Sequence, residues 1–169
     1  YADRLVIEVL TVAEAKSAES AGFTGVLARG FESGGRVSLE STFSLLQRLS
    51  GELSIPYWSQ GGLGPDTAAA ALLAGAAGVV LAEQTWLAAE SPFTKAEQDR
   101  FKGKSVDTIT LGDGRTTYRF LSPIDEEVRT TLDRVSASHS NWKNRLAEYV
   151  AQGRLIAVGQ DISLAERLA

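Results

Sequence analysis

The N-terminal half of the sequence repeats one pattern, in which a short apolar segment is followed by a stretch with helical spacing. Consecutive strand–helix units with short connections require parallel strands, because each helix returns the chain to the same end of the sheet. The apolar segments show little polar alternation, which is typical of strands covered on both faces. The pattern predicts an α/β fold with a parallel sheet, in a barrel or a doubly wound arrangement. The four apolar segments are residues 5–10, 26–28, 55–59 and 78–81.

Local signals mark the helices between these strands. Thr11 and Glu14, three residues apart, form a capping-box pattern, and Gly22 is placed to end the helix that this pattern opens. Apolar residues at helical spacing predict a second helix within residues 39–49. Pro65 opens a third helix that is rich in alanine.

The pattern changes after Pro92. Residues 112–115 hold an Asp-Gly turn between two strand-like segments, which predicts a β-hairpin. We expect residues 1–92 to form the domain of strand–helix units and residues 93–169 to form a small α+β appendage packed on it. The elements expected in the appendage are a helix at 94–101, hairpin strands at 107–111 and 116–120, helices at 122–135 and 142–150, a strand at 155–160 and a short C-terminal helix.

Charge and composition exclude several classes of function. Lys and Arg total 17 and Asp and Glu total 21, so the net charge is −4, which argues against a nucleic-acid or anionic-membrane partner. The chain has no cysteine and one histidine, so we expect no metal site of thiolates or clustered histidines. No apolar run approaches the roughly 18 residues that cross a bilayer, and no signal peptide is recognisable. We therefore expect a cytoplasmic protein.

Glycines follow the third predicted strand and precede the third helix. Gly61 and Gly62 allow backbone N–H groups to approach a phosphate, and the helix N-terminus adds partial positive charge. A second loop, with Glu83 and Gln84, follows the fourth strand. In (βα)8 barrels a phosphate cup typically lies after strands seven and eight, which predicts that these are the last two strands of a barrel. The same glycines are equally compatible with tight turns alone.

The loop of residues 29–36 follows the second predicted strand. Gly34 and Gly35 permit close approach of a ligand, and Arg36 offers a fixed positive charge for a flavin, a phosphate or an acidic substrate. Arginine is a poor general base because its pKa is high. From the spacing alone, an exposed turn with a solvated arginine is the simpler interpretation.

These stretches together resemble the nitronate monooxygenase (2-nitropropane dioxygenase-like) family. Residues 21–35 look like the family's sixth strand and its glycine-rich loop, residues 60–63 like its seventh-strand loop, and residues 74–79 like its eighth strand. Val158-Gly159-Gln160 is similar to a Gly-Gln near the family's C-terminus. The resemblance implies an FMN-dependent TIM (βα)8 barrel, of which this chain supplies the C-terminal half, strands five to eight, followed by the appendage.

The resemblance also implies a set of site residues. The family's catalytic histidine falls at Arg36, which cannot easily take a proton, so nitroalkane oxidation is the less expected chemistry. The family usually has Gly-Thr where this chain has Glu83-Gln84. The positions implied to bind FMN are Gly34, Gly35, Gly61, Gly62, Glu83, Gln84, Gly159 and Gln160.

The version of this domain most similar to the chain is embedded in polyketide-synthase-type and polyunsaturated-fatty-acid-synthase-type proteins. It implies a flavin-dependent oxidoreductase domain, nitronate monooxygenase-like or enoyl reductase-like, acting on a carrier-bound acyl substrate. Two alternatives stay open, a catalytically inactive structural or docking module in such a synthase and a phosphosugar-binding barrel. Half a barrel exposes edge strands, so we expect an upstream half, or a second copy in a homo-oligomer, as partner.

Overall fold

The computed structural model of the chain describes residues 4–99, 101–102, 107–113, 116–121, 125–137 and 141–168. The predicted helix start at Ser122-Pro123 and the turn residues Gly114-Arg115 lie outside these ranges. The N-terminal elements are β1 (Val6–Val9), α1 (Val12–Ser20), β2 (Gly25–Arg29), β3 (Gly35–Val37), α2 (Thr42–Leu49), β4 (Tyr57–Gln60), α3 (Pro65–Leu73), β5 (Gly78–Val79) and the 3-10 helix η1 (Glu83–Thr85). The C-terminal elements are α4 (Lys95–Asp99), β6 (Thr108–Gly112), β7 (Thr117–Leu121), α5 (Glu126–Ala137), α6 (Trp142–Ala151), the 3-10 helix η2 (Gln160–Leu164) and α7 (Ala165–Leu168).

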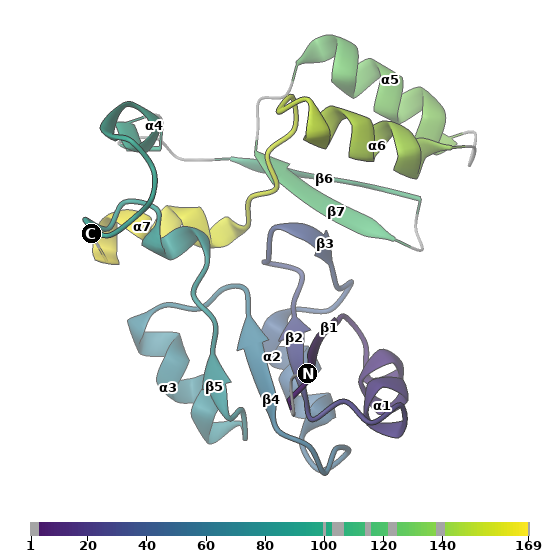
Figure 1. The fold of residues 1–169 in the computed structure, drawn as a ribbon, viewed down its shortest axis with the longest axis vertical. Helices are drawn as coiled ribbons and strands as arrows, with labels where there is room; N and C mark the ends of the chain where they lie inside the picture. Colours follow the sequence, from purple (N-terminus) through teal and green to yellow (C-terminus); the bar gives the residue numbers. More distant parts are fainter. Residues whose placement is uncertain are drawn as a thin grey trace.

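Strands β1, β2, β4 and β5 form a parallel sheet in that order, as the strand–helix repeat predicts (Figure 1). A doubly wound sheet reverses its strand order at a switch point, and no reversal occurs among these four strands. Because the four strands are parallel, their carboxyl ends all lie at one edge of the sheet, together with the loops that follow them.

One face of this sheet is covered by α1, α2 and α3. Val9 and Val26 on this face are buried in a core shared with leucines and alanines of the three helices. Thr11 caps α1 as predicted, because its Oγ1 accepts the N–H of Glu14 at 3.1 Å. The Glu14 carboxylate accepts the N–H of Leu10 at 2.7 Å, so the start of α1 is tied to the end of β1.

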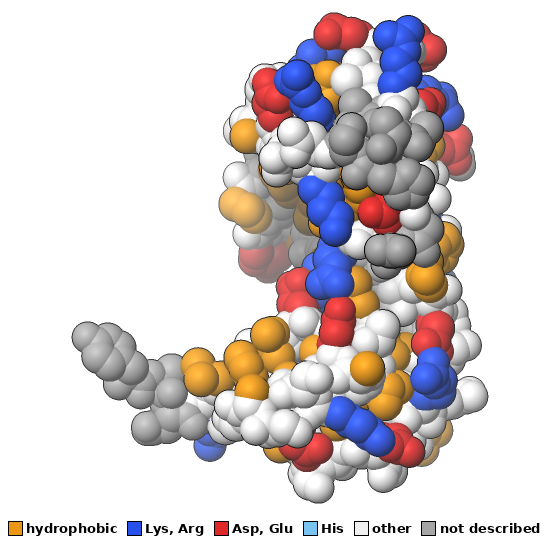
Figure 2. Space-filling view, turned by 90° about the vertical axis from the view of Figure 1, so that its right-hand side faces the viewer, with side chains coloured by type: hydrophobic (Ala, Val, Ile, Leu, Met, Phe, Trp, Pro, Cys, Tyr) orange, Lys and Arg blue, Asp and Glu red, His pale blue; other side chains and the backbone are white. Residues whose placement is uncertain are grey.

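Among the described residues, no helix or strand covers the opposite face of the sheet (Figure 1). The indole of Trp58 lies between Gly25 and Gly78 on the two neighbouring strands, where an added Cβ would come within 2.6 Å and 2.8 Å of the ring. In Figure 2 this face lies on the concave left side of the molecule, where hydrophobic side chains are exposed. A shallow apolar pocket of about 220 Å³ on this face is lined by Val6, Leu27, Trp58 and Val80.

A second, antiparallel sheet has the order β3-β7-β6. The hairpin of β6 and β7 confirms the prediction from the Asp-Gly turn, with Thr110 opposite Arg119. β3 was not predicted, because its residues fall in the glycine-rich stretch expected to be a loop. Arg36 pairs with Tyr118 of β7, and a partner so distant along the chain leaves no local signal in the sequence.

Helices α5 and α6 cover the hairpin, above the parallel sheet in Figure 1. Their apolar side chains bury Phe120 of β7, which is 1 % exposed. The prediction of a strand at residues 155–160 is wrong. Among the described residues, this segment makes an isolated bridge, between Ala157 and Phe120, and no longer pairing. Beyond that bridge the backbone turns toward the glycine loops of the parallel sheet, and η2 and α7 then pack near η1. No helix among the described residues is both long and apolar enough to cross a membrane.

Candidate functional site

Two glycine loops meet at the carboxyl ends of β2 and β4. The hydroxyl of Ser33 donates to the carbonyl oxygen of Gln60 at 2.9 Å, and the N–H of Gly30 donates to the same oxygen at 3.1 Å. A Cβ on Gly61 would lie 2.5 Å from the Ser33 Oγ and 2.9 Å from its backbone nitrogen. The loops around Gly34 and Gly61 are therefore neighbours at one rim, as the sequence predicts, and they touch through their backbones.

The loop after β2 is fastened to the start of α2. The carboxylate of Glu32 accepts the N–H and the hydroxyl of Thr42, both at 2.9 Å. Two arginines hold the carbonyl groups of the same loop. Arg29 donates to the carbonyl of Gly34, and Arg119 of β7 donates from Nε to the carbonyl of Phe31 at 3.0 Å.

Arg119 is a buried cation that sequence reasoning missed. It is 3 % exposed, and its guanidinium lies 4.5 Å from the centroid of the Phe31 ring. Burial lowers the pKa of Arg119 below its usual value, and the charge of Glu32 opposes that shift. Its position in an alternating hairpin strand gave no indication that the side chain would reach the glycine loop.

The C-terminal segment closes the site from the other side. The N–H of Gly159 donates to Glu83 Oε1 at 2.7 Å, and the N–H of Gln160 donates to the carbonyl of Glu32 at 2.8 Å. A Cβ on Gly159 would lie 2.8 Å from that carbonyl oxygen, so the two backbones are in contact. A Cβ on Gly34 would lie 2.5 Å from Glu83 Oε1. The structure thus brings together Gly34, Gly61, Gly62, Glu83, Gly159 and Gln160.

Gln84 joins the two loops that were predicted to bind phosphate. Its side chain is fully buried, and its amide nitrogen donates to the carbonyl of Leu63 at 2.7 Å. Its amide oxygen accepts the N–H of Ala82 at 2.7 Å. Gln84 therefore positions the loop after β4 through hydrogen bonds of both ends of its amide.

Asp161 lies at the centre of the site and was not predicted. It is 1 % exposed, and its Oδ1 accepts the N–H of Gly62 at 2.5 Å. Within the described part of the chain, its Oδ2 has no hydrogen-bond donor. Burial, followed by the charge of Glu83, raises the pKa of Asp161 to about 7, although the amides of Gly62 and Leu63 act in the opposite direction. The one feature of the sequence that could have pointed to Asp161 as a site residue is its place directly after Gly159-Gln160.

While Asp161 accepts the Gly62 N–H, these residues do not fit the phosphate of FMN. The amide of Gly62, which a phosphate oxygen would need, already donates to a carboxylate. The buried carboxylate of Glu83 stands beside it, and an oxygen of that group, Oε2, has no donor among the described residues. A phosphate dianion placed next to these two carboxylates would be repelled. The described residues also contain no cluster of three or more metal-ligating side chains.

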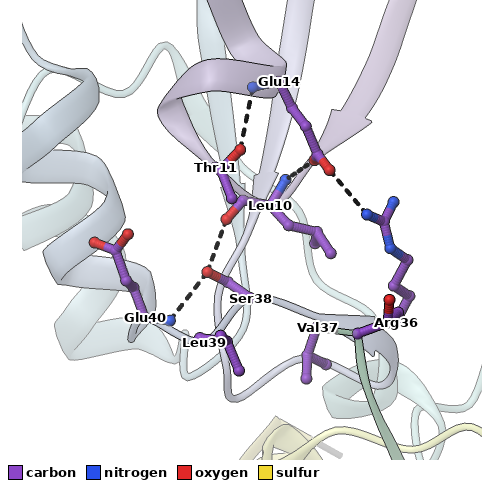
Figure 3. Close-up of a pocket in the computed structure, with 9 residues that line it drawn as sticks. Leu10, Thr11, Glu14, Arg36, Val37, Ser38, Leu39 and Glu40 are labelled. Atoms are coloured by element: carbon purple, nitrogen blue, oxygen red, sulfur yellow. Dashed lines mark hydrogen bonds and ion pairs between the residues drawn. The ribbon is translucent and has the colours of Figure 1, made fainter. Parts of the chain in front are cut away.

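Arg36 and Gly35 lie in β3, to one side of these loops. The guanidinium of Arg36 pairs with Glu14 Oε1 at 2.8 Å, and the side chain is half exposed. Figure 3 shows this pair at the wall of a small pocket of about 190 Å³, where Ser38 also bonds the carbonyl of Leu10 at 2.7 Å. Arg36 thus lies at the carboxyl edge of the sheet, in contact with the start of α1.

One family model matches this chain, and several solved structures share its fold. A sequence model described as nitronate monooxygenase matches residues 3–160. FabK from Thermotoga maritima is similar in fold, with a TM-score of 0.77 and 22 % identity over 95 % of this chain and 55 % of that chain. The nitroalkane oxidase from Streptomyces ansochromogenes gives a TM-score of 0.70 and 22 % identity over 98 % of this chain and 55 % of the other.

The enoyl reductase domain of MlnA from Bacillus amyloliquefaciens is a third similar structure. It gives a TM-score of 0.61 and 13 % identity over 98 % of this chain and 62 % of that chain. The chain spans little more than half the length of these three structures. A search of curated proteins found no match.

Proposed function

Because this chain belongs to the nitronate monooxygenase family, we propose that it supplies strands five to eight of a (βα)8 barrel whose other half lies upstream. The uninterrupted order of the four parallel strands supports this proposal, as does the coverage of about half of each similar structure. The open, apolar face around Trp58 would then be the wall of the barrel interior, which is filled by side chains in such folds.

The complete barrel, in this proposal, is a flavin-dependent oxidoreductase domain of a multifunctional acyl-chain synthase. The observation that carries the proposal is the match to the family over residues 3–160, combined with the meeting of the glycine loops at the carboxyl rim. Catalytic loops of barrels gather at that rim.

The residues of this chain favour enoyl reductase-like over nitronate monooxygenase-like chemistry. Proton abstraction from a nitroalkane needs a base, and an arginine, which stands at position 36, is a poor general base. Its partner Glu14 holds the guanidinium at the rim, where a fixed positive charge can orient the carbonyl oxygen of a carrier-bound acyl thioester. Glu14 and the N-terminus of α1 fix that orientation through the hydrogen bond to Leu10.

Flavin content is the direct test of this function. The protein containing the upstream half should be purified, reconstituted with FMN and desalted, and its bound flavin quantified by absorbance after denaturation. We expect FMN to be retained after reconstitution with excess FMN. With a reduced nicotinamide nucleotide supplied as the two-electron donor, we expect reduction of a 2-enoyl thioester, and we expect no oxidation of a nitroalkane. Failure to retain or bind any flavin would contradict the proposal.

A non-catalytic structural module is the second candidate, and specific observations favour it. Asp161 stands at the Gly62 amide. By the resemblance to the family, Glu83 falls where glycine is usual and Arg36 falls at the position of the catalytic histidine. Such a module would bind neither flavin nor phosphate under any condition.

A further inference from the structure

The loop after β4 has the geometry of an anion site. Gly61 and Gly62 both adopt positive φ, at 108° and 67°, and the N–H groups of Gly62 and Leu63 both act on the carboxyl of Asp161. The loop leads directly into α3, whose N-terminus carries partial positive charge. An acidic group already lies at this point, since the carboxyl oxygen Oδ1 of Asp161 accepts the Gly62 N–H from 99 residues further along the chain.

We propose that the Gly62 and Leu63 amides form a phosphate-binding position that Asp161 occupies as an internal substitute, so that a phosphate group and the segment of residues 159–168 exclude each other. The identity of the phosphate carrier as FMN rests on the proposed function. The exclusion itself rests only on the hydrogen bonds and burial of Asp161. Residues 159–168 are called the C-terminal plug below.

The plug is anchored beside the site by its own packing. Ile162 is 3 % exposed and Ala165 is fully buried, in a cluster with Leu87 of the opposing loop. The backbone of Gly159 is wedged against Glu32 through the close contacts described above. A carboxylate tethered in this way has a high effective concentration at the Gly62 amide, and it outcompetes a dilute free anion.

Other features make the carboxylate replaceable. One oxygen of Asp161 has no donor among the described residues, and the like charge of Glu83 lies close by. The ionised form of Asp161 is disfavoured there, as its raised pKa indicates. Outside the buried part, the pair between Arg167 and Asp66 is largely exposed and contributes little to holding the plug.

The test compares the unaltered protein, containing its upstream half, with an Asp161→Ala variant. Three ligands are titrated by calorimetry, namely inorganic phosphate, FMN and riboflavin, which is FMN without the phosphate. We expect Asp161→Ala to tighten phosphate and FMN about tenfold or more, because the competing carboxylate is gone, and to leave riboflavin unchanged. A phosphate affinity equal to that of the unaltered protein, or an equal gain for riboflavin, would overturn the proposal.

Asp66→Ala is the matched control, since it removes the same charge from the start of α3 at an exposed position. Its gain in phosphate affinity should stay below about threefold, as expected for a screened surface charge. A gain equal to that of Asp161→Ala would overturn the proposal, because it would indicate a general charge effect. If Asp161→Ala tightens phosphate while no form binds FMN or riboflavin, the phosphate site stands and the flavin function fails.

Hydrogen exchange in the unaltered protein provides a second measurement that needs no folded variant. Saturating inorganic phosphate should increase deuterium uptake in residues 160–168, because bound phosphate displaces the C-terminal plug. Uptake that stays equal or decreases at the highest phosphate concentration would overturn the proposal. Residues 126–137 of α5 serve as the internal reference, with unchanged uptake.

Discussion

Single residues decide how the carboxyl rim is used. The sequence pointed to glycine amides, and the structure adds the acidic groups that face them, Asp161 and Glu83. Both carboxylates are buried, and each accepts one backbone N–H from a glycine. The chain thereby satisfies amides of its own loops with its own acids, and Asp161 in addition occupies the amide that an anionic ligand would need.

The buried carboxyl of Asp161 gives a pH dependence of stability. The pKa of Asp161 is raised from the ordinary 3.8 to about 7 in the folded chain, by burial and then by the charge of Glu83, with a smaller contribution from Glu32. Between these values the folded state holds a proton that the unfolded state has released, so the contribution to stability is greatest at low pH and is lost as pH rises to about 7. Each pKa unit corresponds to about 1.4 kcal/mol.

Urea unfolding of the unaltered protein and of Asp161→Asn between about pH 4 and 7 measures this effect. Asparagine does not titrate, so the free energy of unfolding of the unaltered protein relative to the variant should fall as pH rises across the window. A difference that is flat or rising with pH would show that the carboxyl is not protonated in the fold.

At the scale of elements, β7 connects the two parts of the molecule. It pairs with β6 on one side and with β3, which leaves the glycine loop of the parallel sheet, on the other. From β7, Arg119 reaches the carbonyl of Phe31, and Phe120 enters the core under α5 and α6. Adjacent residues of one strand thus serve the site and the appendage, as expected from the alternation of side chains along a strand.

Phe120→Ala should therefore destabilise the protein strongly. Phe120 is 1 % exposed, and loss of such a ring from a packed core typically costs about 3–5 kcal/mol. Urea unfolding should show this loss, whereas the control Leu73→Ala, at a side chain that is 90 % exposed, should change the free energy of unfolding by less than about 0.5 kcal/mol. Equal effects of the two substitutions would mean that the appendage contributes little to the measured stability.

In the whole molecule, as far as its residues are described, the parallel sheet is covered by helices on one face and exposed on the other. Leu5, Val6 and Ile7 at the β1 edge are 51 %, 53 % and 36 % exposed, and Trp58 lies on the open face beside them. An exposed parallel edge next to an apolar face invites pairing with another chain. The proposed upstream half of the barrel would cover both features.

Residues 1–169 alone should therefore associate or precipitate, and light scattering after size-exclusion chromatography measures this. Val6→Lys is expected to shift the population toward monomer, because a lysine on an edge strand opposes pairing. The exposed but distant Leu73→Lys serves as control and should have little effect. A clean monomer of the unaltered segment would argue against the half-barrel proposal.

Local patterns in the amino-acid sequence are enough to predict the repeating strand–helix units, the caps of α1 and α3, the β6–β7 hairpin and the two glycine loops. These features depend on neighbours within a few positions, through side-chain periodicity, turn chemistry and capping. The parallel order of the strands then placed Gly34 and Gly61 at one rim. The residues that resemble the family lie mostly in the strand–helix units and their glycine loops.

The side chains and backbone groups that fill that rim depend instead on long-range packing. The pairing of β3 with β7, the burial of Arg119 and the hydrogen bond from Gly62 to Asp161 each join parts of the chain that are distant in sequence. The segment at residues 155–160 has the composition of a strand, yet contacts of Gly159 and Gln160 with the loops end its pairing after one bridge. Local sequence carries no record of such partners, because they are set by where the packed elements bring the backbone.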